Sequence, residues 1–175
     1  MSNHDTARFL ELLHRLRVDR FRDLAGSRLT TSVPVSESLV NELIAASLPP
    51  HAPVRSVTIR PEAGDRFSVR IVARAALIPA ITLQLAIEQQ PQLPGPGVLT
   101  LRMVTLGGLF GLASGVIAGF LPPAIRLDGE RIHVDLRAVA GERGFSELFD
   151  YLTSLEIHCD VGRLIVGVDA AVPPG

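Results

Sequence analysis

The chain contains no lysine and no tryptophan, and all 17 of its basic residues are arginine. Without a lysine amine there can be no Schiff base, no P-loop lysine and no Ser–Lys dyad. Aromatic residues make up only 5% of the sequence, which leaves few platforms for stacking nucleobases. Because the net charge is −1, charge gives no reason to expect a nucleic-acid partner either.

Cysteine is also scarce, since Cys159 is the only one. One cysteine cannot form an intrachain disulfide, which fits a reducing compartment. The first residues run directly into a charged amphipathic stretch and lack the apolar core of a secretory signal. We therefore expect a cytoplasmic protein.

The 175 residues are 47% apolar and 20% charged, which is typical of one globular domain. Apolar and polar residues alternate over several segments, as in antiparallel strands with one polar face. The sequence predicts an α+β fold, with an N-terminal amphipathic helix in residues 1–27 and a single domain in residues 28–175. The predicted elements are a helix over 5–25, an extended segment over 28–35, a helix over 37–48 capped by Ser36, strands near 54–59, 66–75, 81–88, 98–105 and 124–137, a short helix over 145–152 and a hairpin over 154–172.

A charge-free stretch over residues 103–125 contains glycines four residues apart, which would line one face of a helix. Prolines and glycines at its ends shorten the continuous helix to about 21 Å, less than the ~30 Å core of a bilayer. Three interpretations remain open: a membrane span, a core helix packed closely on a sheet, and a helix lining an apolar cavity. The predicted ligand-binding residues are Leu39, Leu43, Leu83, Leu85, Leu101, Leu109, Leu112, Val116 and Phe120.

A His-x-Asp pattern occurs twice, at His133 and Asp135 and at His158 and Asp160. On a strand these positions point the same way, so each pair could bind a metal or exchange a proton. Two ligands do not make a zinc site, however, and both pairs lie on predicted polar faces. We interpret them as a solvated ladder of charges across strands.

Known catalytic motifs are missing: there is no P-loop, no dinucleotide fingerprint, no nucleophile elbow around Ser114 and no Cys-x-x-Cys. We therefore expect no enzyme, no catalytic residue, no metal and no cofactor. Cys159 lies in an alternating segment and is expected to be structural rather than reactive.

The helix predicted over residues 5–25 combines an apolar stripe with many arginines. Such a helix could contact an anionic membrane surface. Acidic residues are interleaved with the arginines, which favours packing on its own domain or in a homodimer instead.

Three segments resemble small bacterial members of the tubular lipid-binding (TULIP) superfamily: VPVSESLVNELI at residues 33–44, LPPAIRLDGERIHVDL at residues 121–136 and GRLIVGV at residues 162–168. The resemblance covers about residues 28–172 and consists of apolar spacing and turns. It implies a strongly curved antiparallel sheet wrapped around a long helix, with lipid between them and no catalysis. The arginine-rich first helix has no counterpart in this pattern.

Two functions follow as hypotheses. The first is non-enzymatic binding of a lipid or another apolar small molecule in a cavity between helix and sheet. The alternative is a structural or protein-interaction module with a filled core, which oligomerises through the N-terminal helix or through a strand edge.

Overall fold

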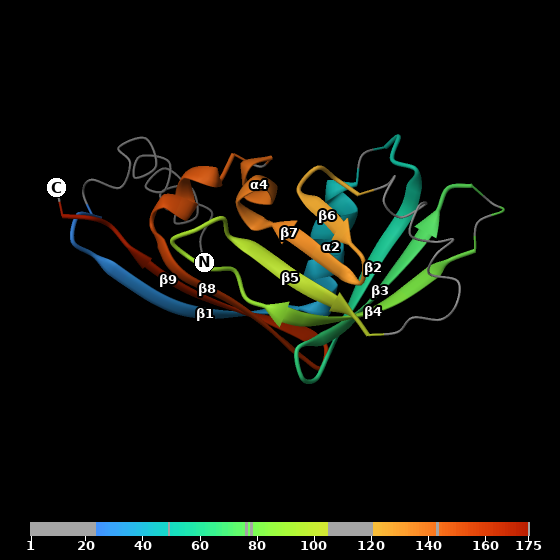
Figure 1. Ribbon diagram of the computed structural model, residues 1–175, viewed down its shortest axis with the longest axis horizontal. Helices are drawn as coiled ribbons and strands as arrows, with labels where there is room; N and C mark the ends of the chain where they lie inside the picture. The colour runs from blue at the N-terminus through green and yellow to red at the C-terminus, as the bar shows by residue number, and fades with distance from the viewer. Residues whose placement is uncertain are drawn as a thin grey trace, which may run out of the picture.

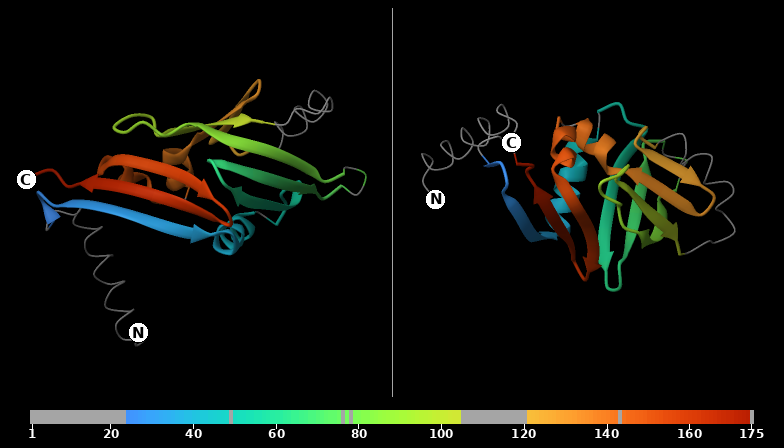
Figure 2. Two further views of the ribbon diagram at one scale, coloured as in Figure 1. Left: turned by 90° about the horizontal axis from the view of Figure 1, so that it is seen from below. Right: turned by 60° about the vertical axis from the view of Figure 1, so that its left-hand side comes forward.

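The computed structural model describes residues 24–48, 50–75, 77, 79–104, 121–142 and 144–174. Over these residues the chain is an α+β protein, as predicted, with antiparallel strands in two sheets and two short α-helices. The two sheets follow one another along the long axis of the molecule (Figure 1), and the view from below shows the same succession (Figure 2).

The smaller sheet joins the first described strand to the last two, in the order β1-β9-β8. Its strands are β1 (Arg28–Ser36), β8 (Leu152–Asp160) and β9 (Arg163–Ala171). β8 and β9 form the predicted hairpin, and Gly162 in its turn has a φ of +71°, which costs a glycine little. β1 pairs with β9 along its whole length, so segments from opposite ends of the chain share this sheet.

The larger sheet has six strands in the order β2-β3-β4-β5-β7-β6. The alternation that predicted its strands is confirmed, since Phe67, Leu83 and Leu85 are buried whereas Arg66, next to Phe67, and Gln84, between the two leucines, are exposed. The strands are β2 (Val54–Glu62), β3 (Arg66–Ala73), β4 (Ile81–Gln89), β5 (Val98–Met103), β6 (Ile125–Asp128) and β7 (Arg131–Asp135).

The helix predicted after Ser36 is confirmed as α2 (Glu37–Ser47). The Ser36 hydroxyl accepts a hydrogen bond from the Leu39 amide at 3.3 Å, which satisfies one of the unpaired donors of the first turn. α2 contacts β1 and β2 and stands between the two sheets in Figure 1.

The third helical region differs from its prediction. The strand expected to continue to residue 137 ends at Asp135, whose carboxylate accepts a hydrogen bond from the Ala138 amide at 2.8 Å and thereby starts α4 (Leu136–Gly141). The short helix expected over residues 145–152 is a 3-10 helix, η2 (Ser146–Asp150), without a side-chain cap.

The prediction of one curved sheet is wrong, because the strands divide into two separately hydrogen-bonded sheets. Side chains occupy the edge of β8 at their junction. The Gln90 amide donates to the Ile157 carbonyl at 2.7 Å and accepts from the Ile157 amide at 2.9 Å. The Asp65 carboxylate accepts from the Cys159 amide at 2.9 Å. Because these side chains satisfy backbone groups of β8, those groups no longer need another strand.

The charge-free stretch over residues 103–125 begins and ends in strands, as predicted for residues 98–105 and 124–137. Met103 is the last residue of β5, and Ile125 is the first residue of β6. Residues 105–120, with the glycines of the pattern, lie outside the described residues, as do residues 1–23 of the N-terminal segment. In the described part of the chain the longest helix is α2, with 11 residues.

The core lies on the inward face of the larger sheet and continues into the smaller one. Its buried cluster includes Phe67, Leu85, Met103 and Ile132 from the six-stranded sheet and Cys159 from β8. Ile157 and Leu164 of the three-stranded sheet pack against the same cluster. One apolar interior therefore joins the two sheets, although their hydrogen-bond ladders are separate.

The orientation of α2 differs from the one predicted. The helical spacing of Leu39, Leu43 and the apolar residues beside them predicts that they face inward, but on α2 Leu39 and Leu43 are 46% and 51% exposed. The helix turns Asn41 toward the edge of β2, where the side-chain amide donates to the Ile59 carbonyl at 2.9 Å and accepts from the Ile59 amide at 2.7 Å. This pair of hydrogen bonds is specific in direction, whereas apolar contact is not.

Replacing Asn41 with alanine should lower the free energy of unfolding by about 2 kcal/mol, because the Ile59 amide and carbonyl both lose their partner. Urea denaturation monitored by circular dichroism measures this change. Glu42→Ala, at the exposed neighbouring position of α2, should have almost no effect. Equal stability of the two variants would show that Asn41 does not hold the helix.

Candidate functional site

One side of the three-stranded sheet is almost entirely apolar. Residues directly opposite each other across strands share a face, and the register sets Val33 opposite Val166 and Val166 opposite Ile157. We call this side the apolar face. Its apolar residues are Leu29, Val33 and Val35 on β1, Leu164, Val166, Val168 and Ala170 on β9, and Leu152, Leu155, Ile157 and Cys159 on β8; Thr31 on β1 is its polar position.

Exposure increases steadily across the apolar face. Leu155 and Cys159 on β8 are buried, and the β9 residues are half-buried. On β1, Leu29 is 58% exposed and Val33 is 46% exposed. The face therefore begins inside the core and ends as an apolar surface on the edge strand.

The other side of this sheet is mainly polar, with Pro34 opposite Ile165 as an apolar pair. It carries Thr30 and Ser32 on β1, Arg163 and Asp169 on β9, and Glu156, His158 and Asp160 on β8. Because one side is polar and the other apolar on the same strands, the exposed residues Leu29 and Val33 are part of an ordered face rather than scattered surface residues.

The predicted ligand-binding residues fall into three groups. Leu83, Leu85 and Leu101 lie together in the buried core of the larger sheet. Leu39 and Leu43 are exposed on α2 and are not members of that core. Leu109, Leu112, Val116 and Phe120 lie outside the described residues.

Leu29 and Val33 were not predicted as ligand-binding residues. The segment from Arg28 to Val35 was expected to be extended, but its polar threonines and serine obscured the alternation. The available signal was the two-residue spacing of Leu29, Val33 and Val35, interrupted only by Thr31.

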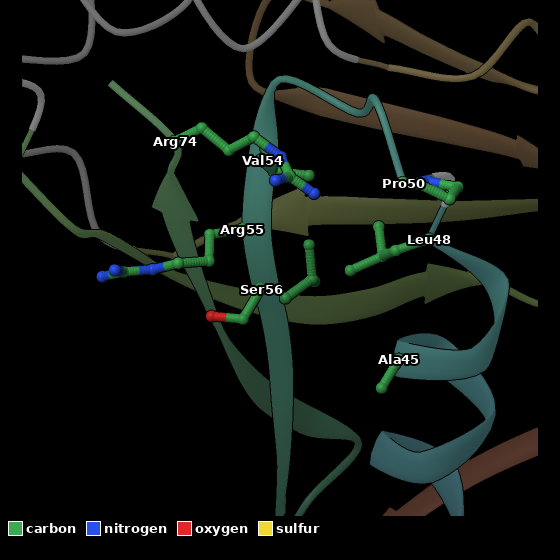
Figure 3. Close-up of a pocket in the computed structure, with 8 residues that line it drawn as sticks. Ala45, Leu48, Pro50, Val54, Arg55, Ser56 and Arg74 are labelled. Atoms are coloured by element: carbon green, nitrogen blue, oxygen red, sulfur yellow. The ribbon is translucent and has the colours of Figure 1, made fainter. Parts of the chain in front are cut away.

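A pocket of about 240 Å³ lies between the end of α2 and β2 (Figure 3). Ala45, Leu48 and Val54 form part of its wall, and the side chain of Arg74 reaches across Val54 (Figure 3). Arg74 is tethered there, since its Nε donates to the Ala52 carbonyl at 2.7 Å. The volume is below the roughly 300–1,000 Å³ of small-molecule sites, so this pocket is too small for a whole lipid.

A second pocket, of about 440 Å³, is polar and lies on the outward face of the larger sheet. Glu88 and Arg131 form an ion pair across its wall, with 2.7 Å between Arg131 Nε and Glu88 Oε2. The Arg131 guanidinium lowers the pKa of the Glu88 carboxyl below its ordinary value. The lining residues are Glu88, Gln89, Thr100, Asp128, Arg131 and His133.

The members of each His-x-Asp pair have separate roles. His133 Nδ1 lies 3.3 Å from the Thr100 hydroxyl, whereas Asp135 caps α4. His158 pairs with Asp65 at 3.2 Å. Within the described ranges, the side chains of His, Cys, Asp and Glu form no group of three or more that could hold a metal ion.

Asp160, the acid of the second pair, binds Arg163 across the hairpin turn, with 2.6 Å between Arg163 Nη2 and Asp160 Oδ2. The hydrogen bonds from Arg163 and from the Val161 amide lower the pKa of the Asp160 carboxyl. The cross-strand ladder predicted for these residues thus consists of separate local contacts.

Asp65 holds the junction between the sheets. It has a φ of +57°, in the left-handed region that aspartate tolerates better than most residues. This conformation directs its carboxylate to both the Cys159 amide and the His158 ring. The hydrogen bond to Asp65 raises the pKa of His158, and burial raises the pKa of the Cys159 thiol to about 11. A thiol with such a pKa is protonated at neutral pH, which fits a structural rather than a reactive cysteine.

None of the helices in the described part of the chain is long and apolar enough to cross a bilayer. The membrane span considered for residues 103–125 falls mainly on residues 105–120, which lie outside the described ranges.

Asp65→Asn should lower the pKa of His158 toward its ordinary value of 6.5, because it removes the charge but keeps an oxygen acceptor for the Cys159 amide. Since the folded-state pKa is raised, the His158–Asp65 pair stabilises the fold fully below pH 6.5, and this contribution disappears as the pH rises through the folded-state pKa. NMR titration of the imidazole and urea denaturation across this pH range measure the two effects.

Asp160→Asn is the matched control, because it removes the same charge two residues along β8 but no contact with His158. A pKa of His158 that responds equally to both substitutions, or to neither, would contradict the role given to Asp65.

Comparisons with models of protein families, with curated proteins and with solved structures find no match to this chain.

Proposed function

We propose that the protein binds a lipid or another apolar small molecule, without catalysis, along the apolar face of the three-stranded sheet. The increase in exposure from β8 to β1 carries the proposal. Contact with water is unfavourable for the apolar side chains at the exposed end of this face. A bound acyl chain would remove this surface from water, which stabilises the complex by about 25 cal/mol for each Å² covered.

The position of the apolar face also supports this function. Cys159, Ile157 and Leu164 extend the core of the larger sheet into the smaller one, so the surface on β1 is continuous with the interior. Neither of the two pockets is lined by a residue of the core cluster. The ligand site that we propose is the open apolar surface that ends on β1.

The tubular lipid-binding resemblance remains a hypothesis that agrees with this proposal. The segment that resembles the family's opening forms the end of β1 and α2, and the closing segment forms part of β9. β9 pairs with β1, which brings these two segments together on one sheet. Among the predicted ligand residues, Leu39 and Leu43 directly follow β1 and offer further exposed apolar surface.

Leu29→Asp and Val33→Asp should each weaken the binding of an environment-sensitive fluorescent fatty acid by about tenfold. Covering about half of such a side chain is worth ~1 kcal/mol, and a buried charge adds to the loss. Both residues are already exposed, so the fold should survive the change. Fluorescence titration of the purified protein measures the affinity.

Thr30→Asp and Ser32→Asp are the matched controls, since they place the same charge on the polar side of the same strand. They should leave the affinity unchanged. The proposal fails if the unmodified protein binds no fatty acid, or if both pairs of variants lose affinity equally.

The alternative is a homodimer, and the position of β1 favours it as the second candidate. Among the described strands β1 is the edge of its sheet, and its nine residues, most of them exposed, can pair with a second copy. Pro34 lacks an amide hydrogen and makes this edge a poorer template. Light scattering separates the two functions. Edge pairing is supported if the protein is a dimer and both Val33→Asp and Ser32→Asp convert it to a monomer. Edge pairing is excluded if the protein is a monomer that binds the fatty acid.

A further inference from the structure

The outward face of the larger sheet is rich in arginine. The register places six arginines on this face, opposite to the core. We call it the arginine face, and the right-hand view of Figure 2 shows its strands side by side. Its arginines are Arg60 on β2, Arg66 and Arg70 on β3, Arg102 on β5, Arg126 on β6 and Arg131 on β7.

Three of these arginines lie in one row across the sheet. The register sets Arg66 opposite Ala86, Ala86 opposite Arg102, and Arg102 opposite Arg131. Adjacent strands are about 4.8 Å apart, so Arg102 and Arg131 are immediate neighbours. Like charges directly opposite each other destabilise a sheet. Glu88 relieves part of this repulsion, because it pairs with Arg131.

Acidic residues neutralise part of the arginine face and leave it with an excess of positive charge. The register sets Glu62 opposite Arg66 and Asp128 opposite Arg131. The carboxylates on this side are Glu62, Glu88, Asp128 and Asp135, of which Glu88 is bound to Arg131 and Asp135 caps α4. Within the described residues, the ion pairs include Arg131 but none of Arg60, Arg66, Arg70, Arg102 and Arg126. All six side chains are exposed. The chain as a whole has a charge of −1, so this face concentrates positive charge locally.

We infer that the arginine face docks on a membrane surface that contains anionic phospholipid. Clusters of four to eight basic residues bind such surfaces, at about 1 kcal/mol for each arginine close to the lipid phosphates. A broad face of guanidinium groups is complementary to a plane of phosphates, each of which can accept two hydrogen bonds from one arginine. This inference depends on charge and register and not on the proposed ligand site.

The composition of the arginine face favours a lipid surface over a nucleic acid. Single-stranded nucleic acids bind through aromatic side chains on which bases stack. The outward positions of the described strands β2–β7 carry no phenylalanine and no tyrosine. A helix or a two-stranded ribbon enters the major groove of duplex DNA, whereas a six-stranded sheet is too broad for it.

Flotation of the full chain with phospholipid vesicles tests the inference. Binding should be strong to vesicles of phosphatidylcholine mixed with phosphatidylglycerol, weak to phosphatidylcholine alone, and should decrease as salt is added. A variant with Arg66→Gln, Arg70→Gln and Arg102→Gln should bind the anionic vesicles about a hundredfold more weakly, from about fivefold for each arginine.

A control variant with Arg28→Gln, Arg137→Gln and Arg163→Gln removes the same charge from other parts of the molecule. It should retain nearly all of the vesicle binding. If both triple variants lose vesicle affinity equally, the arginine face is not the docking surface. If neither variant loses vesicle affinity, another segment, such as residues 5–25, binds the vesicles. Binding to duplex DNA is measured in parallel. If the unmodified chain binds DNA but no vesicles, and the first variant loses the DNA binding, the inference is overturned.

The fatty-acid titration distinguishes this inference from the proposed function. The Arg66, Arg70 and Arg102 substitutions lie on the opposite side of the larger sheet from its core, so they should not change affinity for the soluble fatty acid. Vesicle binding without fatty-acid binding would leave the docking surface in place and exclude the ligand site.

Discussion

The contacts of Asp65 at the junction of the two sheets are the constraint on which the rest of the arrangement depends. Its carboxylate accepts the Cys159 amide and pairs with His158, and nearby the Gly162 amide donates to the Pro61 carbonyl at 3.2 Å. These contacts connect the turn after β2 to the β8–β9 hairpin. Such side-chain contacts take the place of backbone pairing between the sheets, so each sheet keeps its own hydrogen-bond ladder. The apolar interiors of the two sheets are nevertheless continuous.

This junction gives the molecule two different surfaces. On one, the apolar face leads from the buried Cys159 to the exposed Val33, which is the basis for proposing an apolar ligand. On the other, arginines gather on the outward side of the larger sheet, where Arg102 and Arg131 repel each other at a cost in stability. A protein that takes a lipid from a membrane needs both kinds of surface, one to hold the apolar chain and one to approach charged headgroups. The two proposals are thus chemically compatible, although each stands on separate residues.

Sequence patterns predicted those parts of the fold that depend on neighbouring residues. Alternation gave the strands around Phe67 and Leu83, and a serine cap gave the start of α2, because both signals are local. The division into two sheets depends on contacts between Gln90 and Ile157, which are 67 residues apart, and no local pattern contains them. The spacing of Leu39 and Leu43 was misleading for a related reason: the distant edge of β2 binds Asn41 and so determines which side of α2 faces inward. For the candidate site, the predicted ligand residues Leu83, Leu85 and Leu101 lie together in the buried core. The exposed residues of β1 were missed because threonine and serine interrupt their pattern.

The most direct test of the central claim is native mass spectrometry of the full-length protein after incubation with a mixture of phospholipids and fatty acids. The account predicts a population with the 18.8-kDa mass of the chain plus one lipid, which persists after removal of excess lipid. Protein that stays at the mass of the chain alone under these conditions, while it retains its cooperative unfolding, would contradict the claim that the apolar face is a ligand site.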